Sequence, residues 1–340
     1  MKRVFILGSG FSKSVSDHMP LTKDLAYILE EKRDTESSLN SLAMADFHRI
    51  KDFELALSYL AQGAPWKDRE TRTAHLAVFE KIAKRIFREI LDREGRSLNI
   101  DQIPDWLQNF IRFVHKSQST VITFNYDTIL ERATRFTLPN EEKINFDWMY
   151  PKIMTNAKYL DHIPRLGPSV QQSSPFPFVK LHGSINWYYT GDSIASGQQF
   201  VFTPFEATNP GLDLWKLQDY LIDKEPLLIP PIAEKSPYYS SSLVRTLWKQ
   251  AHSAISEATH LYFLGYSLPE TDLTTRLLLS AVSPAARISI VNTSRSQTKE
   301  SLKERYQRSI PHIMDAFFDT DWVGADPIPS IANDMSKWGY

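Results

Sequence analysis

A histidine and an asparagine stand at the ends of two short apolar runs, where their side chains could do acid–base chemistry. His182 follows the run Phe178–Leu181, and Asn125 follows the run Val121–Phe124, with Asp127 two residues further on. In an open α/β sheet, ligands lie beyond the carboxyl ends of the strands. Near neutral pH a histidine can serve as an uncharged base, and an amide at a strand tip is poorly placed for core packing. We therefore expect both side chains to face one pocket.

The third candidate is the turn Gly8-Ser9-Gly10-Phe11-Ser12, which follows the apolar run Val4–Leu7. Glycines at a strand-to-helix turn let backbone N–H groups approach a phosphate, whose charge is favoured at the helix N-terminus. The turn lacks the third glycine of dinucleotide-binding turns, and no strand ending in Asp or Glu follows about 20 residues later. An ordinary tight turn is therefore an alternative interpretation.

Five short apolar runs with polar or glycine tips predict the strands of one parallel sheet. Their apolar residues are contiguous rather than alternating, which is typical of strands buried on both faces. Segments whose apolar residues recur at helical spacing follow several of these runs. This alternation of strand and helix predicts a doubly wound parallel sheet of the Rossmann-like α/β class. The predicted strands are Val4–Leu7, Val121–Phe124, Phe178–Leu181, Leu261–Leu264 and Arg287–Val291.

Residues 35–118 show no strand pattern, and their apolar residues recur at helical spacing. We expect an inserted helical subdomain between the first two strands. The expected division is a sheet domain of residues 1–34 and 119–340 that carries the helical insertion 35–118. The proline-containing stretches 137–177 and 199–238 are expected to be irregular.

The composition narrows the class of protein. The 340 residues carry a formal net charge of −1 and no cysteine. A near-neutral chain is a poor match for a protein that neutralises many phosphates, so no direct nucleic-acid binding is expected. Without cysteine there are no disulfides, thiolate nucleophiles or cysteine-ligated zinc. No apolar run reaches the ~20 residues needed to cross a bilayer, so we expect a cytoplasmic protein that does not bind membranes.

Five motifs in chain order resemble those of the sirtuins. More specifically, the chain resembles the sirtuin-like NAD hydrolases of bacterial antiphage defence, whose late loop reads like the stretch from Leu264 to Asp272, Leu-Gly-Tyr-Ser-Leu-Pro-Glu-Thr-Asp. The resemblance is weaker over residues 35–118, 137–177 and 190–238. The motifs are Gly8-Ser-Gly10-Phe-Ser12, Thr123-Phe-Asn125-Tyr-Asp127, Leu181-His182-Gly183-Ser184, Gly265-Tyr266-Ser267-Leu268 and Val291-Asn292.

This resemblance implies a sirtuin-type fold and an NAD glycohydrolase, with NAD as the substrate. It implies that the catalytic residues are His182, which activates water or a ribose hydroxyl, and Asn125, which positions the ribose and the water. The first turn would cradle the diphosphate, and Asn292 would meet the adenosine ribose, although a helix cap is an alternative role for Asn292 and for Ser267. The residues that the resemblance places at the cofactor are Gly8, Ser9, Gly10, Phe11, Ser12, Thr123, Asp127, Gly265, Tyr266, Ser267 and Asn292.

The departures from the sirtuin pattern separate hydrolysis from deacylation. Sirtuins that deacylate proteins have a zinc module with four cysteines, and their first loop continues into Pro-Asp-Phe-Arg, whereas here Pro20 precedes Leu-Thr-Lys. We therefore expect no bound metal and disfavour a protein deacylase. A protein that holds NAD or ADP-ribose without turnover, as a sensor subunit of a larger defence assembly, is the alternative.

The resemblance also implies control of the activity, because free hydrolysis of NAD would kill the host cell. We expect an abortive-infection effector that depletes NAD and is gated by homo-oligomerisation or by a second defence protein, for example a partner ATPase. The apolar helices of residues 45–115 are the expected contact surface. The trigger, and whether the product is ADP-ribose or a cyclic form, are left open.

Overall fold

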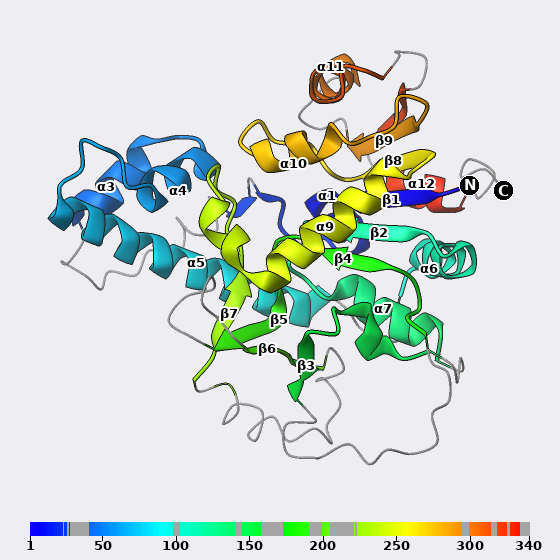
Figure 1. Ribbon diagram of the computed structural model, residues 1–340, viewed down its shortest axis with the longest axis horizontal. Helices are drawn as coiled ribbons and strands as arrows, with labels where there is room; N and C mark the ends of the chain where they lie inside the picture. The colour runs from blue at the N-terminus through cyan, green and yellow to red at the C-terminus, as the bar shows by residue number, and fades with distance from the viewer. Residues whose placement is uncertain are drawn as a thin grey trace.

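A six-stranded sheet, in which every described strand pair is parallel, organises the fold (Figure 1). Its strand order is β10-β9-β8-β1-β2-β4. This arrangement confirms the predicted parallel α/β class, and it adds a sixth strand, β10, to the five predicted. The strands are β1 (Arg3–Leu7), β2 (Thr120–Thr123), β4 (Phe178–Lys180), β8 (His260–Leu264), β9 (Arg287–Thr293) and β10 (Phe318–Gly324).

The computed structural model describes most of the chain, with gaps. The described residues are 1–22, 24–25, 27, 41–97, 103–139, 144–157, 173–190, 199–204, 221, 223–293, 299–313, 318–324 and 327–333. The sequence also predicts a helix over residues 21–32, and most of that range lies outside the described residues.

The direction in which the strands are added reverses between β1 and β8. From β1 the chain builds outward to β2 and β4, and it then returns to the other side of β1 with β8, β9 and β10. In register, Leu7 stands opposite Thr123 on one side and Leu264 on the other. In doubly wound sheets the ligand site lies beyond the carboxyl ends of the strands at such a reversal. The tips that follow these three residues therefore meet at one edge.

Helices cover both faces of the sheet. On one face α6 contacts α7 and α12, and the Phe5 ring of β1 packs edge-to-face on Phe110 of α6, with centroids 5.3 Å apart. On the other face α9 packs on β4 and crosses in front of the strands in Figure 1. The strands are buried because both faces are covered. The helices here are α1 (Ser9–Val15), α6 (Asp105–Ser117), α7 (Ile129–Thr137), α9 (Ser242–Ser256), α10 (Leu273–Leu279), α11 (Lys299–Ser309) and α12 (Pro327–Asn333).

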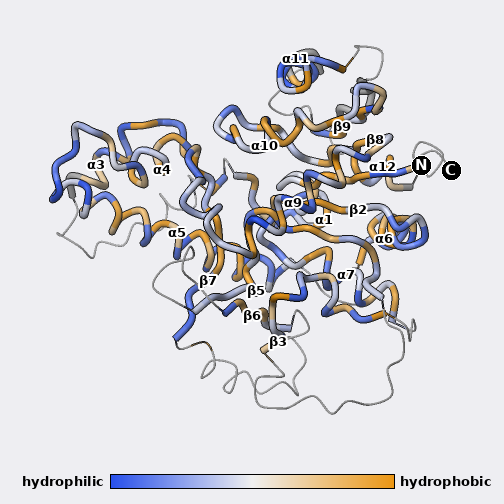
Figure 2. The backbone as a smooth tube through the Cα atoms, viewed as in Figure 1, coloured by the Kyte–Doolittle hydropathy of each residue, from blue (hydrophilic) through white to orange (hydrophobic). Residues whose placement is uncertain are grey.

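Three further helices, α3 (Ser41–Arg49), α4 (Phe53–Ala61) and α5 (Arg69–Ser97), lie between β1 and β2 in the chain and pack on one another. Figure 2 shows α5 alternating between hydrophilic and hydrophobic residues along its length, as expected for a helix with one buried face. The fourth helix of the predicted helical region, α6, packs on the main sheet. The division of the chain at residues 35 and 118 stays a prediction.

A second sheet takes three of its four strands from the stretches 137–177 and 199–238, so the prediction that these stretches are irregular is wrong at those strands. The strand order is β3-β6-β5-β7, with β5 antiparallel to both of its neighbours. The prediction treated proline as a residue that interrupts strands. Pro226 lies in β7, an edge strand, where a missing N–H is tolerated. The elements are η3 (Phe146–Met149), β3 (Met154–Asn156), β5 (Gly183–Thr190), β6 (Gln199–Phe202), β7 (Glu225–Leu228) and η5 (Ser236–Ser240).

Within the part of the chain that the structure describes, no helix is long and apolar enough to cross a membrane.

Candidate active site

Two adjoining hollows lie at the carboxyl edge of the main sheet. The first, here called the inner cavity, is lined by side chains that include Asn125, Asp127, His182, Lys235 and Asp272. The second, the outer cleft, includes Gly10, Asn292 and Arg305. The residues that line both are Ser9, Thr22, Glu54, Gly265, Ser267 and Pro269. The two hollows therefore share a wall made from the first turn, the turn after β8 and helix α4.

Asn125 follows β2 and is oriented by the first turn. Its Nδ2 donates to the Gly8 carbonyl oxygen at 2.9 Å and to Ser12 Oγ at 2.9 Å. Because a carbonyl oxygen can only accept, the amide nitrogen must face Gly8. The Asn125 Oδ1 accepts no hydrogen bond from the described residues, so this oxygen can accept one from a ligand hydroxyl or from water.

Ser12 and Asp127 form the support beneath Asn125. Ser12 Oγ donates to Asp127 Oδ2 at 2.7 Å, and Asp127 Oδ1 accepts from the backbone N–H of Ile129 at 3.3 Å. Both Ser12 and Asp127 are buried. These contacts run from Asn125 through Ser12 to Asp127, so they tie the tip of β2 to helix α1.

His182 enters the inner cavity between two strands of different sheets. It follows β4, and its carbonyl oxygen accepts from the backbone N–H of Ile229 at 2.9 Å. Gly183, which comes next, has φ +82°, and a Cβ there would lie 2.0 Å from the Leu227 carbonyl oxygen. Only glycine fits this turn. The His-Gly pair read from the sequence therefore has a backbone reason that is separate from chemistry.

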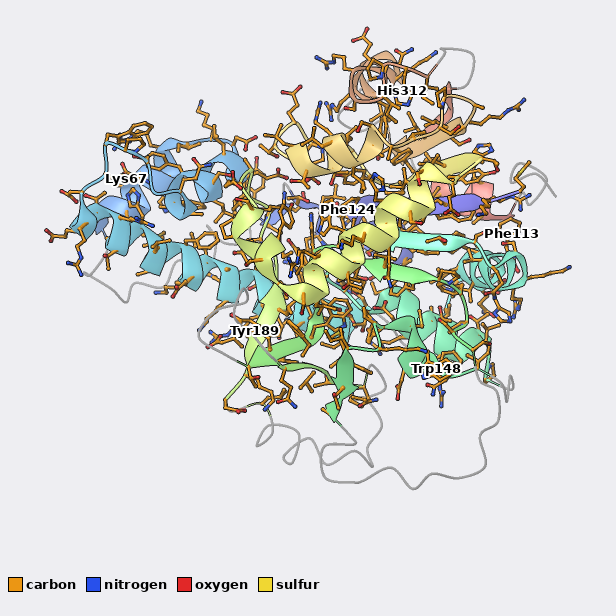
Figure 3. All side chains as sticks on the ribbon, in the orientation of Figure 1. Lys67, Phe113, Phe124, Trp148, Tyr189 and His312 are labelled. Carbon is orange, nitrogen blue, oxygen red and sulfur yellow. The ribbon has the colours of Figure 1, made fainter. Side chains whose placement is uncertain are left out.

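The His182 ring is buried, 7% exposed, and its Nε2 has no hydrogen-bond partner in the described part of the protein. The Phe124 ring lies against it, with centroids 5.1 Å apart, and Figure 3 places Phe124 near the middle of the molecule. Burial, together with the nearby Lys235 ammonium, lowers the pKa of His182 to about 3, although Asp272 opposes this shift. The imidazole is therefore uncharged at neutral pH.

The glycines of the first turn and of the turn after β8 are needed for contact with each other. A Cβ on Gly8 would lie 2.6 Å from the Gly265 carbonyl oxygen, and one on Gly265, at φ +65°, would lie 2.3 Å from the Phe11 nitrogen. The N–H groups of Gly8 and Gly10 donate to the carbonyl oxygens of Leu264 and Gly265 at 3.1 and 3.0 Å. These two N–H groups are therefore already used within the protein, which limits the phosphate cradle expected from the sequence.

The other predicted site residues divide into those that face the hollows and those that do not. Ser9 and Ser267 line both hollows. Asn292 lines the outer cleft and donates from Nδ2 to the Tyr266 carbonyl oxygen at 3.2 Å. Phe11 packs on Phe110 and Trp106 in the core, and Thr123 is buried beneath the tip of β2, where its Oγ1 accepts from the Asn125 N–H. Neither Phe11 nor Thr123 lines a hollow.

Sequence reasoning missed three charged residues of the inner cavity. Lys235 and Asp272 form an ion pair, with Nζ 3.3 Å from Oδ1. Glu54 comes from α4 and accepts a hydrogen bond from the Thr271 hydroxyl. Burial raises the pKa of Glu54, although the Thr271 hydroxyl and Lys235 oppose this. Asp272 ends the late motif quoted above, whereas nothing in the sequence pattern around Lys235 or Glu54 indicated a site.

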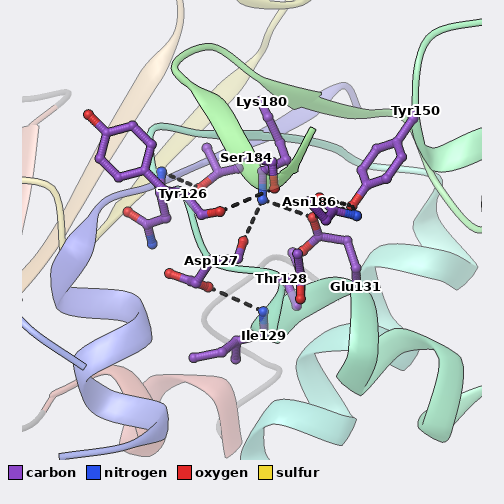
Figure 4. Close-up of polar contacts among 12 residues, drawn as sticks. Tyr126, Asp127, Thr128, Ile129, Glu131, Tyr150, Lys180, Ser184 and Asn186 are labelled. Atoms are coloured by element: carbon purple, nitrogen blue, oxygen red, sulfur yellow. Dashed lines mark hydrogen bonds and ion pairs between the residues drawn. The ribbon is translucent and has the colours of Figure 1, made fainter. Parts of the chain in front are cut away.

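A separate buried polar cluster, here called the network, lies behind Asp127 (Figure 4). Lys180 Nζ lies 2.9 Å from Glu131 Oε1 and also donates to the Asp127 carbonyl oxygen. The Tyr150 hydroxyl donates to Glu131 at 3.0 Å, and Asn186 Nδ2 donates to the Thr203 carbonyl oxygen at 2.8 Å. Lys180, Glu131, Tyr150 and Asn186 line neither the inner cavity nor the outer cleft, whereas Asp127 lines the inner cavity. The network therefore holds the tip of β2 in place from the side away from the site.

No family model and no curated protein sequence matches the chain. Among solved structures, a sirtuin from work on substrate affinity aligns over 100% of this chain and 94% of its own, at 11% identity and a TM-score of 0.44. A Sir2 complex with a p53 peptide and NAD+ aligns over 100% and 93%, at 13% identity and a TM-score of 0.42. The α/β class of the chain rests on the order of its strands.

Proposed function

We propose that the protein is an NAD+ glycohydrolase, which cleaves the nicotinamide–ribose bond with water to give nicotinamide and ADP-ribose. The observation that carries the proposal is that His182 and Asn125, from two neighbouring strand tips, line the same cavity with unused hydrogen-bonding atoms. The order of the five sirtuin-like motifs along the chain supports it.

The reaction requires few groups from the protein. As the C1′–N bond lengthens, positive charge moves from the pyridinium ring to the ribose, and nicotinamide leaves as a neutral molecule. Water then adds to C1′, and the proton that it loses passes by way of His182 to solvent. Asn125 Oδ1 orients the water or a ribose hydroxyl, and the uncharged His182 accepts the hydrogen bond from it. Help of this kind from a positioned base is worth about 10²–10⁴-fold in rate.

The remainder of NAD+ extends from the inner cavity into the outer cleft. The shared wall supplies the Ser9 and Ser267 hydroxyls. It also supplies the Ser9 N–H, which makes no hydrogen bond to the described part of the chain. In this arrangement the diphosphate passes the shared wall, and Asn292 lies at the adenosine end. The rest of the first turn acts through its packing rather than through direct contact.

One observation favours a second candidate, a sensor that binds NAD+ or ADP-ribose without turnover. A histidine whose pKa is held near 3 by burial and Lys235 is a weak base. Hydrolysis therefore requires that His182 act chiefly as a hydrogen-bond acceptor, or that the bound substrate change its surroundings. A protein deacylase is disfavoured, since the chain has no cysteine for the zinc module of those enzymes.

The biological setting that we propose is NAD depletion in bacterial antiphage defence, gated by oligomerisation or a partner protein. The deciding experiment is to incubate the purified full chain with NAD+ and to measure nicotinamide and ADP-ribose by chromatography. Wild type should release both in equal amounts, whereas Asn125→Ala should release neither. Tight binding of NAD+ without any release, at every protein concentration tried, would favour the sensor.

A further inference from the structure

The buried ion pair of Lys235 and Asp272 has no part in the reaction described above. Their side chains are 3% and 5% exposed, and both line the inner cavity. Asp272 is fixed in place, because its Oδ2 accepts from the hydroxyls of Tyr266 at 2.7 Å and Thr275 at 2.9 Å. Burial opposes ionisation of this carboxyl, but the Lys235 ammonium and the two hydroxyl donors hold the pKa of Asp272 below its usual value.

Both members of the pair have hydrogen-bonding capacity that the protein does not use. An ammonium group has three donors, and within the described part of the chain Lys235 Nζ has one acceptor, Asp272 Oδ1. A carboxylate oxygen can accept two hydrogen bonds, and this Oδ1 accepts one from the described residues. Buried polar groups normally have partners, so spare capacity beside a cavity points to a ligand. The pair offers that ligand a donor and an acceptor side by side.

A primary carboxamide has the matching pattern, since its oxygen accepts and its NH2 group donates from the same planar unit. We infer that Lys235 and Asp272 form the subsite that recognises the carboxamide of nicotinamide, with Lys235 donating to the oxygen and Asp272 accepting from the N–H. This inference rests on the proposed function, which brings the nicotinamide ring into the inner cavity. The walls there include Leu25, Ile90 and Phe124, which suit the faces of a pyridine ring.

The same arrangement selects against a carboxylate in place of the carboxamide. Nicotinate has no N–H to donate to Asp272, and its negative oxygens would lie close to the Asp272 carboxylate. Like charges in a buried site repel strongly. The subsite therefore favours nicotinamide over nicotinate, although Lys235 alone would favour the anion.

The test uses the free rings, which need no turnover. Nicotinamide and nicotinate are titrated separately into the full chain, and their dissociation constants are measured by ligand-observed NMR. Wild type should bind nicotinamide at least about tenfold more tightly than nicotinate. The double variant Lys235→Met/Asp272→Asn should lose about tenfold in nicotinamide affinity and bring the ratio of the two constants close to one. Both residues change together because removing one leaves an uncompensated buried charge.

The matched control is the exposed ion pair Lys84–Glu225, whose closest N–O distance is 3.2 Å with side chains 55% and 52% exposed. Lys84→Met/Glu225→Gln should keep both wild-type constants. If the buried double variant does not fold, the two wild-type constants decide, and nicotinate bound as tightly as nicotinamide would contradict the inference. An unchanged ratio in the folded buried variant, or no binding of nicotinamide by wild type, would overturn the inference. Nicotinamide release from NAD+ tests the proposed function separately, so either can fail while the other stands.

Discussion

Two buried polar clusters flank the tip of β2, and they differ in how completely their hydrogen bonds are made. In the network, Lys180 and Glu131 are each 1% exposed, and Lys180 Nζ has a carboxylate and a carbonyl oxygen as partners. In the inner cavity, His182 Nε2 has no partner in the described residues, and Lys235 has one. Burial is similar in the two places, so burial alone does not distinguish a site from its scaffold.

The unused hydrogen-bonding atoms of the inner cavity indicate that this cluster, and not the network, is built for a ligand. Buried polar groups are costly unless they are hydrogen-bonded, so a cluster with its partners in place serves the fold. A cluster with unused donors and acceptors beside a hollow is destabilised by their burial until a ligand supplies the hydrogen-bond partners. The expected consequence is a division of effects: changes in the network lower stability, and changes in the inner cavity lower activity.

The largest expected effect is on turnover, from His182→Asn. This change keeps a polar side chain but removes the imidazole, and it removes a buried nitrogen that has no partner. We expect kcat for nicotinamide release to fall by about 10²–10⁴-fold, with a free energy of unfolding in urea within about 1 kcal/mol of wild type. Because the pKa of His182 is about 3, wild-type kcat should show no ionisation of this histidine between pH 5 and 8. A loss of stability with turnover intact would reverse the assignment of the two clusters.

The next largest effect is on stability, from Lys180→Met in the network. The variant leaves the Glu131 carboxyl buried without its ammonium partner, and breaking such a pair costs about 3–5 kcal/mol. Urea unfolding followed by circular dichroism should show a loss of this size. The control is Lys180→Met/Glu131→Leu, in which both charges are gone and most of the loss should be recovered. A single variant as stable as wild type would show that the network does not hold the fold.

A smaller effect is expected from Glu94, a carboxyl of α5 whose Oε2 accepts from the backbone N–H of Thr128 at 2.7 Å. Burial, helped by Asp127, raises the pKa of Glu94 to about 7. The folded protein then keeps a proton that the unfolded chain releases near pH 4.5, so the contribution of Glu94 to stability falls as the pH rises from about 4.5 to 7. The stability of wild type relative to Glu94→Gln should drop over this range by at most about 3 kcal/mol. A difference that is constant with pH would contradict the raised pKa.

The parts of the fold that could be predicted from the sequence are those in which a local pattern has one physical solution. Contiguous apolar runs ending in a polar tip, such as the run before Asn125, fit a parallel sheet covered on both faces. Because parallel strands end at the same edge, the prediction that Asn125 and His182 face one pocket followed from the class of sheet. The roles proposed for these residues are predictions.

The rest of the site depends on contacts between distant segments. Lys235 lies in a stretch whose prolines predicted irregular structure, and Glu54 lies on a helix whose pattern gives only its apolar face. Each reaches the inner cavity through tertiary packing, which leaves no local signal. The glycines show the converse, since the motif suggested phosphate contact, whereas the N–H groups of Gly8 and Gly10 are bonded to the turn after β8.

The smallest predicted effect distinguishes the two serines of the first turn, which the sequence treated alike. Ser9 lines both hollows, whereas Ser12 accepts from Asn125 Nδ2 and donates to Asp127 Oδ2. Ser12→Ala removes the hydroxyl that joins Asn125 to Asp127. Asn125 then loses one of the two side-chain hydrogen bonds that orient it. We expect kcat to fall about tenfold, which corresponds to the loss of one hydrogen bond of about 1.4 kcal/mol, with little change in NAD+ affinity.

Ser9→Ala, three residues earlier in the same helix, should instead weaken NAD+ binding and leave kcat near wild type. Calorimetric titration of NAD+ beside the nicotinamide-release assay separates the two. If Ser12→Ala changed affinity alone, Ser12 would belong with the residues that contact NAD+, and Asn125 would be held by Gly8 without it.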